Sequence, residues 1–362
     1  MKIMTILGTR PEIIRLSRII LALDGVCEHV LVHTGQNFDR NLNEIFFQEL
    51  ELRLPDYVLN CRGTTVMEQI ACILRRSEKV LKAEHPDRIL ILGDTNSALS
   101  ALTAKRMGIP VFHMEAGNRC YDDRVPEEVN RRVIDHCSDI LLPYTERSRA
   151  NLLREGIASQ KIMVTGNPIR EVLNYYAGKI EASNALSKYQ LEAHKFFLVT
   201  LHRAENVDVP QRLNSFVAAL EQLHQEYQFP VICSVHPHTR AQLQKNNLFL
   251  EAKGLQAYEP LGLIDFLKLE KNAFCVLSDS GTVQEECCLL GIPNVILRDV
   301  SERPETMEAG SSLIAGHQPD SILNAVKAVR NLDLPWLPPD EYLRENVSET
   351  VSRILLSVIP RI

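Results

Sequence analysis

The sequence has no excess of basic residues. Its 362 residues include 40 Lys and Arg against 46 Asp and Glu, which gives a formal net charge of −6. Proteins that bind nucleic acids usually carry a basic excess or a basic stripe, so this balance argues against a nucleic-acid partner. A local cationic pocket for an anionic small molecule is compatible with the same net charge.

Long apolar runs are also missing. No stretch of 18 apolar residues could span a bilayer, and the N-terminal MKIMTILGTRPE has no small-residue cleavage site. We therefore expect neither a membrane partner nor a signal peptide. The nine cysteines form no CxxC pair, and most of them lie inside apolar segments. This usage is typical of reduced thiols, so we expect a cytoplasmic protein.

The sequence also lacks the fingerprints of common cofactors. No G-x-G-x-x-G follows a predicted strand, which counts against a nicotinamide-dependent mechanism. His236 and His238 have no cysteine or carboxylate partners at the spacing of a metal site. We therefore expect no cofactor and no metal.

Short apolar runs alternate with amphipathic stretches, a pattern that is typical of parallel α/β units. The chain becomes polar and irregular over 181–195, between two series of such units. We predict an α/β protein with two doubly wound, Rossmann-like domains at 1–167 and 168–340. A C-terminal helix within 341–362 would pack back across the domain junction. The predicted strands are 2–8, 29–35, 88–94, 111–117, 140–144 and 161–166 in the first domain, and 196–202, 231–237, 257–260, 274–280 and 294–298 in the second.

Clusters rich in Asp, Glu, His and Arg follow nearly every predicted strand. In open parallel sheets ligands bind at the carboxyl ends of the strands, so these clusters indicate a site. Any fold has polar strand ends, but it does not require this enrichment in charged side chains and histidine. The clusters are GTRPE, GDTNS, EAGNR, TGNP, LHRAEN, SVHPHT, SDSGT and RDVSERPE.

The segment SDSGTVQEE (278–286) is the clearest single candidate. Its turn at residues 280–282 opens a helix after a strand, and the backbone N–H groups of such a turn bind phosphate. Glu285 and Glu286 would repel phosphate, whereas a carboxylate at this depth can accept hydrogen bonds from a ribose diol. The alternative interpretation is a capped helix with exposed acids.

Arginines and acids at the other strand ends complete the candidate site. Arg10 and Arg15 are natural partners for a diphosphate, although each alone is also typical of a surface. The acids at 94, 115 and 127 follow successive strands. Carboxylates gathered in one cleft raise each other's pKa, which is how a proton-transfer site is assembled. A solvated loop that runs into a helix would explain the acids at 115 and 127 equally well.

Together these segments resemble the non-hydrolysing UDP-N-acetylglucosamine 2-epimerase family. Each motif is short, but the resemblance runs nearly end to end and in the family's order. The segments that carry it are GTRPE (8–12), GDTNS (93–97), HMEAG (113–117), PEEVNRR (126–132), TGNP (165–168), SDSGTVQEE (278–286) and ERPE (302–305).

The resemblance implies a fold, a reaction and an oligomeric state. The fold is two Rossmann-like domains in the glycosyltransferase-B arrangement with the active site in the interdomain cleft. In the reaction UDP leaves C1 of a UDP-sugar substrate by anti-elimination while a base removes the C2 proton. The 2-acetamidoglucal and UDP then recombine with C2 inverted, as in the conversion of UDP-N-acetylglucosamine to UDP-N-acetylmannosamine. A homodimer and a role in polysaccharide biosynthesis are also implied.

The resemblance further implies which residues act. Ser280 and Gly281 resemble the phosphate seat and Glu286 the ribose ligand, while His202 and Arg10 resemble groups on the diphosphate side. The implied catalytic set is Asp94, Glu115, Glu127, His202 and Arg131. The implied substrate and UDP ligands are Arg10, Arg15, Asn130, Arg203, His236, Ser280, Gly281, Thr282, Glu286 and Arg303.

Three segments and one residue depart from the family pattern. The loop NRCYDDRV (118–125) is short and resembles members that epimerise modified sugars, such as those that form UDP-N-acetyl-L-fucosamine or UDP-diacetamido-mannuronate. The substituents at C3 to C6 of the sugar therefore stay open. Arg15 stands where the family often has lysine, and LHRAEN (201–206) where it has GHRRES. GQNFD (35–39) replaces the QHRE-like segment of an allosteric UDP-sugar site.

Three other functions remain as alternatives. A hydrolysing 2-epimerase shares the fold and the motifs but lets water capture the glycal. A glycosyltransferase would need an acceptor groove, and the sequence has no basic amphipathic helix of the kind that accompanies one. A non-catalytic UDP-sugar sensor would keep the nucleotide ligands but would not need Asp94, Glu115 and Glu127 together.

Overall fold

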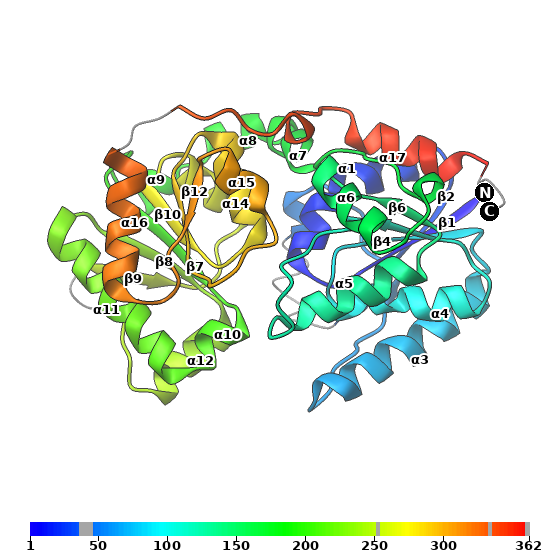
Figure 1. Cartoon of the computed structure of the whole chain (residues 1–362), viewed down its shortest axis with the longest axis horizontal. Helices are drawn as coiled ribbons and strands as arrows, with labels where there is room; N and C mark the ends of the chain where they lie inside the picture. The colour runs from blue at the N-terminus through cyan, green and yellow to red at the C-terminus, as the bar shows by residue number, and fades with distance from the viewer. Residues whose placement is uncertain (36–45, 251–253, 332–334, 359–362) are drawn as a thin grey trace. The chain divides into compact units, whose positions relative to one another are not determined.

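The structure is a computed structural model that describes residues 1–35, 46–250, 254–331 and 335–358. The chain divides into two compact units (Figure 1). Unit 1 comprises Met1–Asn174 and Asp340–Ile362, and unit 2 comprises Tyr175–Pro339. Unit 1 thus continues past the predicted boundary at residue 167, and it includes the C-terminal segment.

Unit 1 is built on a six-stranded parallel sheet in the order β3-β2-β1-β4-β5-β6. This is the strand order of a Rossmann-type sheet, in which the order reverses beside β1. The strands are β1 (Lys2–Leu7), β2 (Glu28–His33), β3 (Tyr57–Val58), β4 (Arg88–Leu92), β5 (Val111–Met114) and β6 (Ile140–Leu142).

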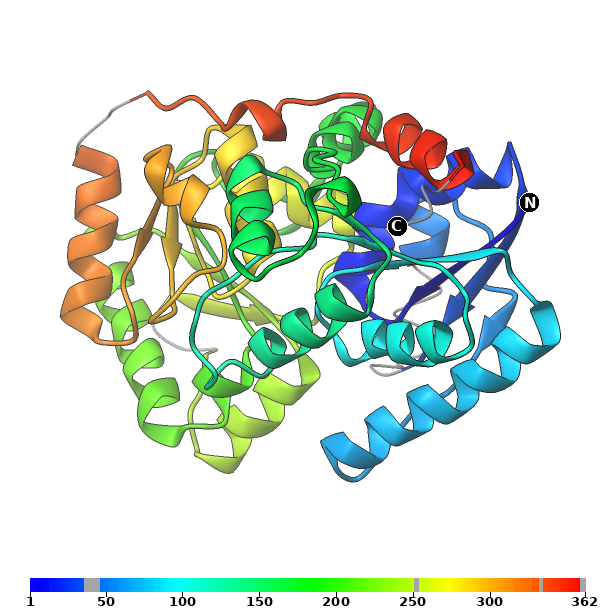
Figure 2. The ribbon, with the colours of Figure 1, turned by 45° about the vertical axis from the view of Figure 1, so that its right-hand side comes forward.

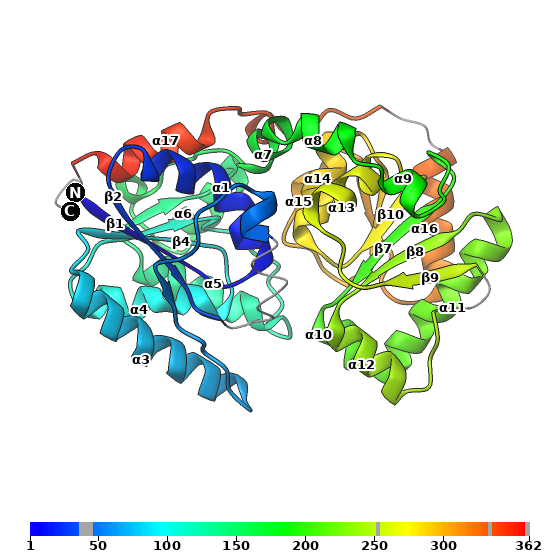
Figure 3. The same ribbon diagram turned by 180° about the vertical axis from the view of Figure 1, so that it is seen from behind.

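Helices cover both faces of this sheet. Helices α3, α4 and α5 lie on one face, and α1, α6 and α17 lie on the other (Figures 1 and 3). The first face is sealed by a core in which Ile6 and Ile91 of the strands pack with Ile73 of α3 and Ile134 of α5. The helices are α1 (Arg10–Asp24), α3 (Val66–Glu84), α4 (Ser100–Arg106), α5 (Pro126–Cys137), α6 (Glu146–Arg154), α7 (Ile169–Tyr175) and α17 (Val347–Leu356).

Unit 2 repeats the same topology. Its parallel sheet has the order β12-β11-β10-β7-β8-β9, so the strand that comes first in sequence again lies inside the sheet. The strands are β7 (Phe197–Leu201), β8 (Val231–Val235), β9 (Leu255–Tyr258), β10 (Cys275–Ser278), β11 (Asn294–Ile296) and β12 (Ser312–Ile314).

Two separate cores hold the helices of unit 2 to its sheet. One contains Leu213 of α11, Leu243 of α12 and Val326 of α16. The other contains Phe266 of α13 and Val283 of α14. The helices are α8 (Ala177–Ala182), α9 (Ala185–Lys188), α10 (Ala204–Val207), α11 (Pro210–Tyr227), α12 (Pro237–Lys245), α13 (Leu263–Lys271), α14 (Gly281–Leu290), α15 (Pro304–Glu308) and α16 (Pro319–Asn331).

The predicted α/β class with two doubly wound, Rossmann-like domains is confirmed. The strand predicted at 161–166 is wrong, because there only Ile162 makes an isolated bridge, to Leu141. The short edge strands β3 and β12 were not predicted. Within the described residues, no helix is both long and apolar enough to cross a membrane.

Candidate active site

The turn after β1 opens α1 and buries an acid. Thr9 is the N-cap of α1, and the Glu12 carboxyl accepts hydrogen bonds from the backbone N–H groups of Gly8 and Thr9, the latter at 2.9 Å. The hydroxyl of Thr95, after β4, donates to the other Glu12 oxygen at 2.5 Å. Burial raises the pKa of Glu12 to about 7, against the opposing hydrogen bonds. Glu12, which the sequence analysis missed as a site residue, thus joins two strand-end loops.

Arg10 and Arg15 lie on the first two turns of α1. The Arg10 guanidinium carbon is 4.3 Å from the ring centroid of Phe46, within cation–π range. Arg15 is 3% exposed and forms an ion pair with Glu115, the acid that follows β5. Helix α1 therefore delivers one arginine directly to a predicted catalytic carboxylate.

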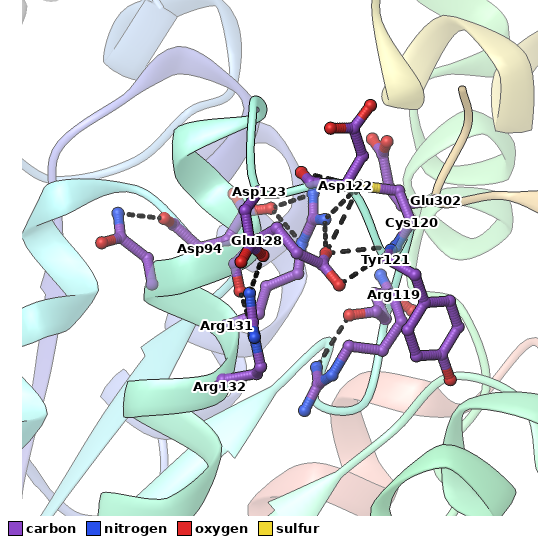
Figure 4. Close-up of polar contacts among 12 residues, drawn as sticks. Asp94, Arg119, Cys120, Tyr121, Asp122, Asp123, Glu128, Arg131, Arg132 and Glu302 are labelled. Carbon is purple, nitrogen blue, oxygen red and sulfur yellow. Dashed lines mark hydrogen bonds and ion pairs between the residues drawn. The ribbon is translucent and has the colours of Figure 1, made fainter. Parts of the chain in front are cut away.

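Asp94 lies after β4 and is held by α5. Nε of Arg131 is 2.8 Å from Oδ2 of Asp94, and its Nη1 is 2.6 Å from the Glu128 carboxylate (Figure 4). Arg131 is 2% exposed, so water screens these ion pairs weakly. Asn130 donates from Nδ2 to the backbone oxygen of Asp94 at 2.9 Å. The predicted residues at 94, 130 and 131 are therefore in direct contact.

Glu115 occupies a strained backbone conformation. Its φ of 66° is in the left-handed region, which non-glycine residues rarely adopt. The Glu115 N–H donates to Leu142 O of the neighbouring strand β6 at 3.1 Å, and Asn118 Nδ2 donates to its carboxylate at 3.3 Å. Such strain clusters at functional sites, where the surrounding structure enforces a side-chain direction.

Two adjacent glutamates at the start of α5 have different environments. Glu127 is half-buried, whereas Glu128 is 1% exposed and accepts hydrogen bonds from the N–H groups of Cys120 and Tyr121 at 3.1 and 3.0 Å. Burial alone would raise the pKa of Glu128, but the hydrogen bonds from Cys120 and Arg131 hold it below its ordinary value. Glu128 therefore anchors the loop over 118–125, a role that the sequence analysis missed.

In unit 2 the residues after β7 are held by a buried aspartate. Asp279 accepts hydrogen bonds from the N–H groups of His202 and Arg203, and its Oδ1 is 3.1 Å from Nδ1 of His202. Asn206 Nδ2 donates to the same carboxylate at 3.1 Å. Burial would raise the pKa of Asp279, but the His202 charge and these donors lower it to about 2. Asp279 directly precedes Ser280 but was not among the predicted site residues.

The predicted phosphate seat begins α14. Ser280 is the N-cap and its N–H donates to Oγ of Ser278 at 3.0 Å. A Cβ on Gly281 would lie 2.8 Å from Oε1 of Glu302, so any larger residue here would have to displace the end of the Glu302 side chain. Thr282 is 9% exposed. The turn thus opens a helix after a parallel strand, where anions bind.

Both acids of α14 are buried, so the alternative of exposed acids is wrong. Glu285 is 0% exposed and Glu286 3% exposed. Glu285 forms an ion pair with Arg303. Burial, together with the Glu286 charge, raises the pKa of Glu270 on α13 well above its ordinary value. The Glu286 charge therefore acts on a second buried carboxyl group, that of Glu270.

The remaining predicted ligands are placed near the strand ends of unit 2. Nη2 of Arg203 is 3.7 Å from the Glu302 carboxylate. His236 is exposed at the N-cap of α12, where its Nδ1 accepts the His238 N–H at 3.3 Å. No group of three or more His, Cys, Asp or Glu side chains in the described part of the chain could hold a metal ion. In GQNFD (35–39), which replaces the QHRE-like segment of some family members, residues 36–39 lie outside the described residues.

Comparison of the sequence and the structure with known proteins identifies a family. The sequence model of a family described as UDP-N-acetylglucosamine 2-epimerase matches residues 21–356. The UDP-N-acetylglucosamine 2-epimerase of Methanocaldococcus jannaschii is 43% identical over 347 residues, which are 94% of this chain and 95% of that protein. Its crystal structure in complex with UDP-GlcNAc and UDP covers 98% of this chain and 99% of that one, with a TM-score of 0.94 and 42% identity.

A second relative has a different sugar in its name. The UDP-2,3-diacetamido-2,3-dideoxy-D-glucuronate 2-epimerase of Pseudomonas aeruginosa is 37% identical over 332 residues, which are 90% of this chain and 92% of that protein. The family model covers well over half of the chain, and the relatives match it nearly end to end. The chain therefore belongs to the UDP-N-acetylglucosamine 2-epimerase family, of the non-hydrolysing kind that its motifs predict.

Proposed function

We propose that this chain is an isomerase that inverts C2 of a UDP-2-acetamido sugar without net hydrolysis. The observation that carries the proposal is in unit 1. Asp94 and Glu115 follow the adjacent parallel strands β4 and β5, and each carboxylate is paired with a buried arginine. Carboxylates at neighbouring strand ends suit a reaction that removes a proton from one face of a carbon and returns it to the other.

The proposed chemistry divides between acids and cations. The carboxylates of Asp94, Glu115 and Glu127 remove and return the proton at C2 and bind the sugar hydroxyls. As the C1–O bond breaks, its electron pair leaves with UDP, and the cations of Arg10 and His202 stabilise the departing diphosphate. When UDP adds back to the 2-acetamidoglucal, the same bond reforms and C2 receives a proton on the opposite face.

Unit 2 would supply most of the nucleotide ligands. The turn that starts α14 suits the diphosphate, and the buried Glu286 suits the two hydroxyls of ribose. Arg203, Arg303 and His236 are the further proposed ligands. The position of the active site in a cleft between the two domains stays a prediction.

The substrate is UDP-N-acetylglucosamine or an analogue modified on its sugar. The short loop at 118–125 supports the second option, because its three exposed residues, Tyr121, Asp123 and Arg124, directly precede the acids of α5. A panel of UDP-sugars therefore belongs in the first experiment.

We also propose a cytoplasmic homodimer. All nine cysteines are free thiols, which suits a reducing compartment. Apolar side chains are exposed on the helices of one face of unit 1, and a second copy of the chain could cover them. Their exposed fractions are 59% for Val66, 69% for Met67, 39% for Leu102, 47% for Val129 and 39% for Val133. Light scattering after size exclusion measures the mass directly, and a monomer would contradict this part.

Proton NMR in D₂O tests the reaction. The protein is incubated with UDP-N-acetylglucosamine and, separately, with UDP-linked 2-acetamido sugars that are 6-deoxygenated or oxidised at C6. Deuterium at C2 with UDP still attached is the expected result, and the sugar that exchanges fastest names the substrate. Accumulation of free sugar would indicate a hydrolysing enzyme instead, and tight UDP binding without any exchange would indicate a sensor.

The variant Glu115→Gln separates catalysis from binding. It keeps the shape of the side chain but removes the charge that faces Arg15, so we expect C2 exchange to fall at least about 100-fold. UDP affinity should change no more than about threefold. Glu349→Gln, an exposed acid on α17, is the matched control. Wild-type exchange in Glu115→Gln would remove Glu115 from the proton-transfer set.

A further inference from the structure

A buried histidine connects the loop of Asp94 to α5. His113, the third residue of β5, is 1% exposed. Its Nε2 is 2.8 Å from the backbone oxygen of Gly93, the residue before Asp94, and its Nδ1 is 2.8 Å from Oδ1 of Asp135 on α5. A carbonyl oxygen only accepts hydrogen bonds, so Nε2 is the protonated nitrogen and donates a hydrogen bond to the Gly93 oxygen.

The other oxygen of Asp135 holds the loop of Glu115. Oδ2 accepts the N–H of Gly117 at 3.1 Å and is 2.8 Å from Nη2 of Arg119. Burial alone would raise the pKa of Asp135, but the hydrogen bond from His113 and the Arg119 charge hold it below its ordinary value. Both oxygens of Asp135 are therefore engaged, Oδ1 with Nδ1 of His113 and Oδ2 with Gly117 and Arg119.

This pair reaches all three acids of the proposed proton-transfer set through the backbone. His113 fixes the peptide before Asp94, and Asp135 fixes the peptide two residues after Glu115. Asp135 also lies two helical turns after Glu127 on the same helix, α5. We infer that His113 and Asp135 are positioning residues, which set the spacing of the three carboxylates without touching the substrate.

The inference rests on the proposed function and adds a specific consequence. Elimination and re-addition need the acids in one fixed geometry, and a displacement of about 1 Å can cost about 100-fold in rate. If the spacing loosens, re-addition slows relative to escape of the intermediate. The 2-acetamidoglucal and UDP should then leave the enzyme more often per turnover.

The test compares Asp135→Asn and His113→Gln with His136→Asn. The control residue is the neighbour of Asp135 on α5, is 53% exposed on its side chain and lies 3.6 Å from Glu155. C2 exchange by NMR, UDP affinity by calorimetry and free glycal per turnover are measured on the full chain. For both network variants we expect a 10- to 100-fold lower kcat, KM and UDP affinity within about threefold, and several-fold more released glycal.

Each outcome decides between positioning and mere structural support. Wild-type kcat and wild-type glycal release in the network variants would overturn the inference. A lower rate without extra glycal release, or loss of folding in both variants by circular dichroism, would also overturn it in favour of a structural role. Absence of C2 exchange in the wild-type protein would instead overturn the proposed function, so the two failures are distinguishable.

Discussion

Glu12 lies fully buried at the third position of α1, where its carboxyl accepts hydrogen bonds from Gly8, Thr9 and Thr95. Burial raises its pKa to about 7, whereas an unfolded chain would ionise this group near 4.5. Between these two values the folded protein holds a proton that the unfolded chain has lost. The contribution of Glu12 to stability is therefore complete below pH 4.5 and is lost as the pH rises through 7.

We expect Glu12→Gln to remove this pH dependence. Glutamine keeps the capping geometry but does not titrate. From pH 5 to pH 8 the free energy of unfolding of the wild type should fall relative to the variant, by at most roughly 3 kcal/mol. Thermal unfolding at several pH values measures the difference, with Glu349→Gln as a control that keeps the wild-type slope. Parallel pH profiles for wild type and Glu12→Gln would show that the carboxyl titrates normally.

At the scale of single residues, the sequence predicted where acids gather but not what each acid does. Glu127 and Glu128 are identical neighbours in sequence, yet one is half-buried and the other accepts two backbone hydrogen bonds under the loop. Burial separates the two roles, and burial is a tertiary property. The Thr9–Glu12 spacing is a capping box, which the sequence alone could have revealed.

At the scale of elements, the connection from β5 to α5 has unusual backbone angles. Glu115, Gly117 and Tyr121 all have positive φ, at 66°, 80° and 55°. A Cβ on Gly117 would lie 2.3 Å from the backbone oxygen of Ser148 on α6. The chain therefore turns sharply against α6 there, and only glycine fits.

Gly117→Ala should destabilise unit 1 more than Gly108→Ala. Both glycines have positive φ, 80° and 75°, but nothing lies within 4 Å of a Cβ on Gly108. The left-handed backbone alone costs alanine about 1–2 kcal/mol, and the contact with Ser148 adds about 1–3 kcal/mol. Urea unfolding of both variants measures the two costs. Equal losses of stability would mean that α6 can shift away from the added Cβ without a cost in folding free energy.

The same connection shows why strand boundaries were overestimated. The predicted strand at 111–117 ends at Met114, because the left-handed Glu115 turns the backbone out of the ladder. Segment 161–166 has the apolar residues of a strand but follows β6 at the edge of the sheet, where it makes a single bridge. Apolar composition predicts burial well, whereas pairing depends on a neighbouring strand that local sequence does not describe.

At the scale of the whole molecule, unit 1 contains both ends of the chain. Helix α17 packs against α1 and lies along it in Figures 1 and 2. Arg88 donates to Leu355 O, and the Ser348 N–H donates to Glu171 on α7 at 2.9 Å. The sequence showed a C-terminal helix, but its partner is more than 300 residues away in the chain, beyond the reach of any local pattern.

Truncation after Pro339 should therefore unfold unit 1, although it removes only the C-terminal segment. The deleted segment includes Val347, Val351 and Leu355, each 0% exposed. Their burial contributes about 1.5–3 kcal/mol per side chain, a sum comparable to the whole stability of an ordinary domain. Limited proteolysis with mass spectrometry should show rapid cleavage within residues 1–174 and slow cleavage within 175–339.

The control is a chain that ends at Ser357 and so lacks only residues beyond α17. It should resist proteolysis like the wild type, because Val358 is 91% exposed. Equal resistance of unit 1 to proteolysis in both truncated chains would show that the sheet and α1 stay folded without α17.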